Sequence, residues 1–549
     1  MRSADTIFHN GTVHTMTSRD SLSHAVAIKD GLIVAIGMPD VEAWKGRATE
    51  IVDLNGQFLL PGFQDAHIHP TAGGLAQLRC DLSGMHDRSE YLDAIGEYAK
   101  SNPSAPSIQG AGWYGDVFED GFPDKSLLDA IEQHRPIVLN SHDGHGVWAN
   151  SEALQRAGIT RDTADPVGGR IHRDANGEPT GMLIERAADL VTDLLPPPTA
   201  DDIEAALLQA QRYLHSLGIT AWQDAAVGNA LDMPDAFDTY RSLANRGMLT
   251  AKVTAALWWN HDADPEEQLA RLLKRRAQGQ IGNFQATAVK IMLDGVCENL
   301  TGSMLEPYRN QGDNRGLSFI EPEALRSVVA DLDAEEFDVH IHAVGDCAVR
   351  DAVDSLSLVP RNHGDRRHQI THLDIIEEPD AIRMGDLGII ANLQPLWARL
   401  DPVLVSTKLP YLTREQQIHH FAFRTIRDAG SPLAFSSDWP VSSPDPLWGA
   451  HVAVNRTAPR TDPHALDKKS QTEPLLPDES VDTHDALAAY TIGAARANRL
   501  DDATGTLELG KSADIIVLDR DPYKTPSREL SDIEVQLTMV DGRAVYSKD

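Results

Sequence analysis

The spacing of apolar and polar positions has the same texture at the two ends of the chain. Residues 4–60 and 513–546 consist of short apolar or β-branched runs, separated by the pairs Asn10-Gly11, Asp30-Gly31 and Asp541-Gly542. Such pairs favour the tight turns of β-hairpins. Neither end is long enough to bury a core alone. The pattern therefore predicts that residues 1–60 and 500–549 pair into one small β-sandwich domain.

Between these ends, helical and strand spacings alternate. In residues 201–217 the apolar positions share one helical face, Gly218 ends the segment, and a short strand follows at residues 220–222. Residues 325–332 and 485–499 predict further helices. This alternation is typical of βα units around a parallel sheet, so an α/β fold is expected.

Residues 70–200 interrupt this alternation. The segment is rich in Gly, Pro and Asp, and it closes with Pro196-Pro197-Pro198. We interpret it as a large insertion within a central domain of residues 61–499. The insertion is expected to cover the active site at one end of that domain.

Composition excludes several classes of protein. The 49 Lys+Arg against 82 Asp+Glu give a net charge of −33, which disfavours nucleic acid or an anionic membrane as a partner. Three scattered cysteines, Cys80, Cys297 and Cys347, are too few for a disulfide framework, and packing is expected for the latter two. The N-terminus lacks the apolar core of a signal peptide, and no apolar run approaches the ~20 residues of a membrane span. A cytoplasmic globular protein is expected.

Polar residues of the types that bind metal ions or catalyse reactions stand at the ends of apolar runs. His67 and His69 are two positions apart at the end of one run, so their imidazoles project to the same side and can bind one metal ion. Lys290, His342, His372 and Asp438 lie in or close four later runs. Catalytic residues of a (β/α)8 barrel collect at the carboxyl ends of its strands.

The intervals between these residues fit such a barrel, whose units average roughly 30 residues. They place Lys290 on strand 4, His342 on strand 5, His372 on strand 6 and Asp438 on strand 8. The much longer interval from His69 to Lys290 is accounted for by the insertion. Residues 61–499 are therefore predicted to form a (β/α)8 TIM-like barrel.

This set of residues resembles the amidohydrolase superfamily, and more narrowly the amidohydrolase 3 family, which includes N-substituted formamide deformylases. The matching segments are Leu60-Pro61-Gly62-Phe63 with Asp65, His67 and His69; Lys290-Ile291 with Asp294-Gly295; His342-Ala343-Val344-Gly345-Asp346; Ser437-Asp438 with Pro440; residues 143–151; and residues 177–181. The resemblance implies a metal-dependent hydrolase that cleaves an amide, N-formyl or N-acyl C–N bond of a small molecule.

The resemblance also implies the roles of the site residues. His67, His69 and Asp438 would hold one metal ion, His342 and His372 a second, and Lys290, carboxylated to a carbamate, would bridge them. Two Zn²⁺ ions per chain are expected, with Mn²⁺ or Fe²⁺ as alternatives. A metal-bridging hydroxide would attack, with Asp438 as the general acid/base. A homodimer is the family-level expectation.

Several alternatives stay open at this point. Lys290 could be a salt-bridged barrel lysine without a carbamate, and His340 shares a strand side with His342 and could compete as a ligand. His145, Trp148 and Trp113 are predicted to bind substrate, with packing inside the insertion as the alternative. The competing functions are a cyclic-amide hydrolase, a deaminase, or a degenerate member acting as a binding or scaffold protein.

Overall fold

The computed structural model describes residues 3–118, 121–142, 144, 146–166, 169–228, 230, 233–360, 365–465 and 468–548. It separates into two compact units. Residues 1–70 and 210–549 form one, here called the barrel unit. Residues 71–209 form the other, here called the insertion unit.

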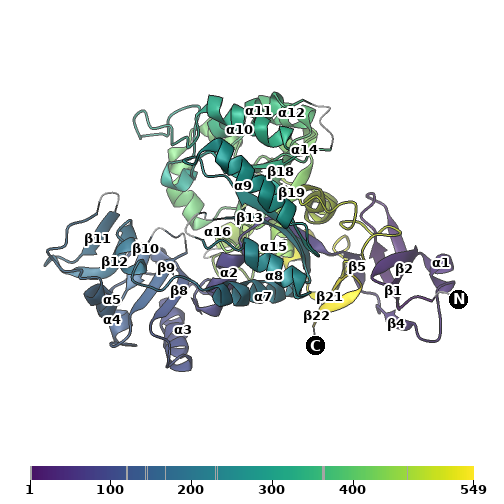
Figure 1. Cartoon of the computed structure of the whole chain (residues 1–549), viewed down its shortest axis with the longest axis horizontal. Coiled ribbons are helices and arrows are strands. Elements are labelled where there is room, and N and C mark those ends of the chain that lie inside the picture. The colour runs from purple at the N-terminus through teal and green to yellow at the C-terminus, as the bar shows by residue number, and fades with distance from the viewer. Residues whose placement is uncertain are drawn as a thin grey trace. The chain divides into compact units, whose positions relative to one another are not determined.

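Eight parallel strands make up the barrel sheet, and they are neighbours in chain order from β6 to β19. Figure 1 labels β13, β18 and β19 among them. They are β6 (Phe63–Ile68), β13 (Ile219–Val227), β14 (Lys252–Trp258), β15 (Phe284–Met292), β16 (Asp338–Ala343), β17 (Gln369–His372), β18 (Ile390–Leu393) and β19 (Leu433–Phe435). Near the carboxyl ends of the two outermost strands, the backbone N–H of Asp438 donates to the His67 carbonyl and that of His69 to the Trp439 carbonyl, both at 2.9 Å. These bonds bring the first strand against the segment that follows the eighth.

Helices connect consecutive barrel strands, as the alternating pattern predicted. The principal ones are α7 (Ala200–Ser216), α8 (Phe237–Asn245), α9 (Pro265–Gln278), α10 (Pro322–Ala334), α11 (Asp346–Ser357), α12 (Glu378–Leu387) and α14 (Phe423–Asp428), and α15 (Pro446–Asn455) follows the last barrel strand. The helices expected at residues 201–217 and 325–332 are confirmed as α7 and α10. The segment 485–499 is helical through Ala497, with a π-helical turn at Ala489–Gly493 between α17 (Thr483–Ala488) and α18 (Ala494–Ala497).

Strands from both chain ends share one sheet, in the order β22-β21-β20-β5-β1-β2-β3, with β4 paired to β1. The strands are β1 (Thr6–His14), β2 (Leu22–Lys29), β3 (Leu32–Ile36), β4 (Glu50–Asp53), β5 (Phe58–Pro61), β20 (Ile515–Leu518), β21 (Val535–Val540) and β22 (Arg543–Ser547). The predicted turns are confirmed at Asp30-Gly31 and Asp541-Gly542, where all four residues have positive φ. In the sheet order, β20 from the C-terminal end pairs with β5 from the N-terminal end.

The hairpin predicted at Asn10-Gly11 is wrong. The pair lies inside β1 as a bulge, with Asn10 at φ 59° and the register with β2 shifting between His9 and Val13. The reason is a contact distant in sequence: residues 54–57 pack against the bulge, and a Cβ on Gly11 would come within 2.6 Å of the Gln57 carbonyl oxygen. Positive φ at Asn10 thus serves a close approach of backbones instead of a chain reversal.

The insertion unit has a sheet of its own, in the order β11-β12-β10-β9-β8-β7. Its strands are β7 (Cys80–Asp81), β8 (Ile108–Trp113), β9 (Ile137–Ser141), β10 (Gly146–Ala149), β11 (Gly169–Arg173) and β12 (Pro179–Glu185). Helix α3 (Arg88–Ser101) packs on it through Tyr91, Ile95 and Ala99. The expectation that this segment covers the active site stays a prediction.

None of the helices in the described ranges is both long and apolar enough to cross a membrane. The predicted cytoplasmic location stays a prediction.

Candidate metal centre

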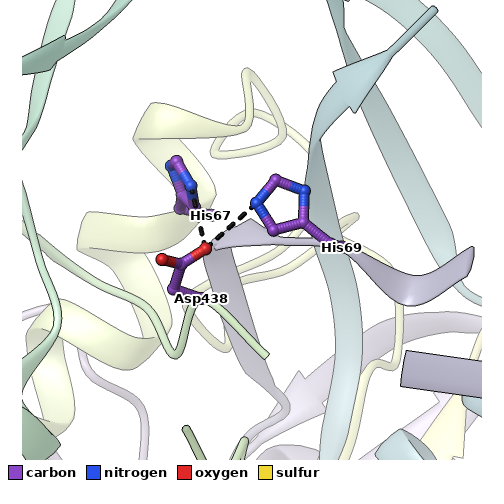
Figure 2. A group of neighbouring side chains, drawn as sticks. All are labelled: His67, His69 and Asp438. Atoms are coloured by element: carbon purple, nitrogen blue, oxygen red, sulfur yellow. Dashed lines mark ion pairs between the residues drawn. The ribbon is translucent and has the colours of Figure 1, made fainter. Parts of the chain in front are cut away.

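Three predicted ligands converge where the first and eighth barrel strands end (Figure 2). His67 Nε2 and His69 Nε2 lie 3.2 Å and 3.0 Å from the same atom, Asp438 Oδ1. Asp65 holds this arrangement together, because its carboxylate accepts hydrogen bonds from the backbone N–H of His67 at 3.0 Å and from the Ser437 hydroxyl at 2.6 Å. The first strand and the segment after the eighth are therefore joined directly beneath the ligands.

This donor set fits a divalent metal ion. Ligand atoms of His67, His69 and Asp438 lie within 4.8 Å of one another, and none of the described residues meets the buried Asp438 Oδ1 in hydrogen-bond geometry. A buried carboxylate oxygen left unpaired costs several kcal/mol unless a cation or donor completes it. Two imidazole nitrogens and a carboxylate oxygen are ligands that Zn²⁺, Mn²⁺ and Fe²⁺ accept.

The other three predicted ligands adjoin this group. The His372 ring centroid lies 5.0 Å from that of His67 and 4.3 Å from that of His342. Lys290 Nζ lies 3.5 Å from His67 Nδ1. All six residues stand at the strands that the sequence predicted, and the structure brings them into one cluster; metal binding by them stays a prediction.

Burial dominates the electrostatics of the cluster. It lowers the pKa of the His342 imidazole to about 3 and those of His67 and His372 well below the ordinary value, so these rings are neutral, as ligation requires. Burial also lowers the pKa of the Lys290 amine to about 7, although the Asp438 carboxylate opposes the shift. Burial raises the pKa of Asp438 itself, but His69, His372 and Lys290 lower it by more, and the net pKa lies below the ordinary value.

Asp294 positions the loops after the fourth and fifth strands. Its buried carboxylate accepts backbone N–H groups of Ser303, Val344 and Gly345 at 2.8–3.0 Å, and its Oδ1 lies 3.6 Å from His342 Nε2. Burial raises the pKa of this carboxyl to about 7 despite these bonds. Asp294 belongs to the segment with Lys290 that resembles the family, but only the structure shows that its carboxylate binds the two loops together.

Sequence reasoning missed Trp397. Its indole lies parallel to the His372 ring, with centroids 5.5 Å apart and an interplanar angle of 4°, and it is half-buried. It belongs to the short 3₁₀ turn Pro395–Trp397 that follows the seventh strand. The sequence did contain a signal for Trp397, because this residue follows an apolar strand run closely. The candidate ligands were identified by the same criterion.

The residues predicted to bind substrate have a different setting. Trp113 and Trp148 are 1% and 0% exposed in the core of the insertion unit, and their ring N–H groups donate to the carbonyls of Leu139 and Asp124 at 2.8 Å and 3.2 Å. The two rings meet edge to face at 6.4 Å. This burial favours the packing alternative over substrate binding. His145 lies outside the described residues.

Replacing either tryptophan should therefore affect stability and leave catalysis largely unchanged. We expect Trp148→Ala to destabilise the insertion unit by about 3–5 kcal/mol, since it empties a buried aromatic site. Trp148→Phe, which refills most of the volume, should recover much of that loss. Thermal unfolding measures the loss of stability. KM for any substrate that the protein turns over shows whether substrate binding has changed as well. A raised KM in a Trp148→Phe variant of normal stability would restore the substrate-binding role.

A (β/α)8 barrel with histidine, lysine and aspartate side chains clustered at the carboxyl ends of its strands fits a metal-dependent hydrolase, and the family match supports this class. The chain belongs to the amidohydrolase family, whose model matches residues 50–546.

Individual relatives span nearly the whole chain. The protein LONG AFTER FAR-RED 3 of Arabidopsis thaliana is 31% identical over 99% of this chain and 92% of its own length. The N-substituted formamide deformylase of Arthrobacter pascens is 27% identical over 99% of this chain and 98% of its own. Among solved structures, an uncharacterized metal-dependent hydrolase from Pyrococcus furiosus shares the fold with a TM-score of 0.72 at 24% identity, covering 94% of this chain and 100% of that one. The predicted family and fold are confirmed.

Proposed function

We propose that this protein hydrolyses a C–N bond of a small-molecule amide, N-formyl or N-acyl compound, using divalent metal held at the barrel's carboxyl end. The observation that carries the proposal is that the imidazoles of His67 and His69 converge on one buried carboxylate oxygen of Asp438. The Lys290 amine lies beside His67. The deformylase relative supports the choice of bond, because its name describes hydrolysis at a substituted formamide nitrogen.

His67, His69 and Asp438 would hold a first ion, and His342 and His372 a second, with a carbamate on Lys290 between them. Such ions lower the pKa of bound water and polarise a carbonyl. A protonated lysine has no lone pair for a metal, whereas a carbamate offers two oxygens. With its pKa lowered to about 7, much of the Lys290 amine is neutral near pH 7–8, and the neutral amine is the form that can add carbon dioxide.

Asp438 would move the proton in this proposal. Its pKa lies below the ordinary 3.8, so it is a carboxylate at neutral pH and can accept a proton from the attacking water. Both imidazoles contact Oδ1, which leaves the other oxygen, Oδ2, outside these two contacts (Figure 2). That oxygen can carry the proton to the leaving nitrogen, which must be protonated before an amine departs.

The test is a substrate screen on protein loaded with Zn²⁺ or Mn²⁺. N-formyl, N-acyl and cyclic amides should be compared, with chelator-treated protein as the control. We expect turnover of an open-chain N-formyl or N-acyl compound that is lost with the metal and restored by adding it. Turnover confined to cyclic amides, or ammonia release from an amino-substituted ring, would establish the cyclic-amide hydrolase or the deaminase instead. Less than about one ion per chain and no chelator-sensitive hydrolysis would indicate the scaffold.

A further inference from the structure

The interior of the barrel below the ligand cluster is polar, which is unusual. Barrel interiors are ordinarily filled with branched apolar side chains, and each buried polar group there requires a partner. Here several barrel strands and the residues directly after them contribute a set of polar side chains that are at most 2% exposed. The set, called the polar belt, consists of Gln223, His340, Gln369, Asn392, Gln394 and Ser436.

The polar belt links two predicted ligands through an unbroken run of side-chain hydrogen bonds. From His67 Nδ1 the run passes at 2.8 Å to His340 Nε2, and from His340 Nδ1 to Gln223 Oε1. It continues from Gln223 through Gln369 at 3.1 Å to Asn392 at 2.7 Å. From Asn392 it passes through Ser436 at 2.6 Å and Gln394 at 2.8 Å to His372 Nδ1 at 2.8 Å.

Backbone carbonyls set the direction of this run. Gln223 Nε2 donates to the Ala497 carbonyl at 3.2 Å, so its other amide atom, Oε1, must be the one that faces His340. Asn392 Nδ2 donates to the Ala66 carbonyl at 2.9 Å and to Gln369 Oε1, so Asn392 Oδ1 accepts from the Ser436 hydroxyl. The amide orientations are therefore determined by fixed acceptors.

The direction determines the tautomers of the histidines. Gln223 Oε1 can only accept, so His340 carries its proton on Nδ1, and its Nε2 accepts the proton of His67 Nδ1. The other neighbours of His67 Nδ1 lie farther away, Thr371 Oγ1 at 3.3 Å and Lys290 Nζ at 3.5 Å. The unprotonated nitrogen of His67 is then Nε2, the atom that faces Asp438.

The same logic applies at the other end of the run. The Ser436 hydroxyl lies 2.6 Å from Asn392 Oδ1 and 3.3 Å from the Leu393 carbonyl oxygen, and donating to either acceptor uses its one proton. Ser436 therefore accepts from Gln394 Nε2, which leaves Gln394 Oε1 facing His372 Nδ1. His372 therefore carries its proton on Nδ1 and has a free lone pair on Nε2. His340, with both ring nitrogens engaged, has none to offer a metal.

We propose that the polar belt presets His67 and His372 as Nδ1–H tautomers for metal binding through Nε2, and that His340 and Gln394 are positioning residues instead of ligands. The proposal rests on the metal site of the proposed function. Ligand histidines generally donate their second N–H to a fixed acceptor, and loss of that acceptor costs 10–100-fold in metal affinity. In this barrel one buried network supplies both acceptors.

The test measures Zn²⁺ affinity by chelator competition and the visible absorption spectrum of Co²⁺-loaded protein. We expect Gln394→Leu and His340→Leu to weaken Zn²⁺ binding by about 10–100-fold and to alter the Co²⁺ spectrum. Gln394→Glu retains an acceptor for His372 Nδ1 and should restore affinity and spectrum. Gln285→Leu is the matched control, because this barrel glutamine bonds to Thr254 and to the carbonyls of Asn498 and Arg499 and makes no bond to the polar belt.

Thermal unfolding of the metal-free variants separates a folding defect from the predicted effect, since lost stability alone does not change the Co²⁺ spectrum of the folded fraction. Affinities of Gln394→Leu and His340→Leu equal to that of Gln285→Leu, with wild-type Co²⁺ spectra, would overturn the proposal and leave the proposed function standing. A wild-type protein that binds neither Zn²⁺ nor Co²⁺ would overturn both.

Discussion

Replacing Asp438 with asparagine is expected to lower kcat by about 10²–10⁴-fold, the usual contribution of a general acid/base. Asparagine has nearly the same shape and retains one oxygen toward His67 and His69, but it cannot accept and return a proton at neutral pH. Steady-state kinetics on the substrate found by the screen measure the loss, and the metal content of the purified variant should stay close to that of the wild type.

The matched control is Asp331→Asn, an equivalent exchange at an exposed position on α10. It should leave kcat and metal content unchanged. An Asp438→Asn variant that turns over within about tenfold of the wild type, with its metal bound, would remove Asp438 from the proton-transfer role. Loss of the metal together with activity would instead assign Asp438 chiefly to ligation.

Replacing His69 with alanine is expected to have the second large effect, on metal affinity. Within the described part of the chain His69 Nδ1 has no hydrogen-bond partner, and Nε2 faces Asp438 Oδ1, so the substitution removes a predicted ligand and disturbs little else. We expect Zn²⁺ affinity to fall by more than the roughly 100-fold upper range for losing a supporting residue. Ion content after dialysis, measured by plasma mass spectrometry, checks this directly.

Unfolding in the presence of Zn²⁺ provides a second measurement of the same loss. An ion at 100 times its Kd stabilises the folded state by about 2.7 kcal/mol, so the wild-type melting temperature should rise with added Zn²⁺. The rise should shrink in His69→Ala and persist in His24→Ala, which removes an exposed histidine of β2. Equal rises in all three proteins would contradict the assignment of His69 to the metal site.

Much of the candidate site followed from the sequence because its signals are local or regularly spaced. A strand places residues two apart on one side, which paired His67 with His69 before any contact was known. The repeat length of βα units then assigned Lys290, His342, His372 and Asp438 to particular strands, and the topology confirms each assignment. The hairpin turns at Asp30-Gly31 and Asp541-Gly542 could be predicted for the same reason, because the two residues of each turn carry the signal.

The features that sequence reasoning did not obtain depend on partners distant along the chain. Asn10-Gly11 became a bulge because residues 54–57 pack against it, and no local signal distinguishes that bulge from a hairpin turn. Trp113 and Trp148 are compatible with a pocket or a core, and only their neighbours in the folded insertion unit place them in a core.

The sequence by itself indicated the fold class and the barrel strand at which each candidate residue stands, because periodicity and unit length are properties of the chain alone, and the family resemblance implied which of those residues bind metal. Only the tertiary structure decided how those ligands are oriented. His340 reads as a competing ligand in the sequence, yet its two nitrogens are engaged by His67 and Gln223, on strands 273 and 117 residues away. A hydrogen-bond direction arises from groups brought together by folding, so no spacing rule along the chain contains it.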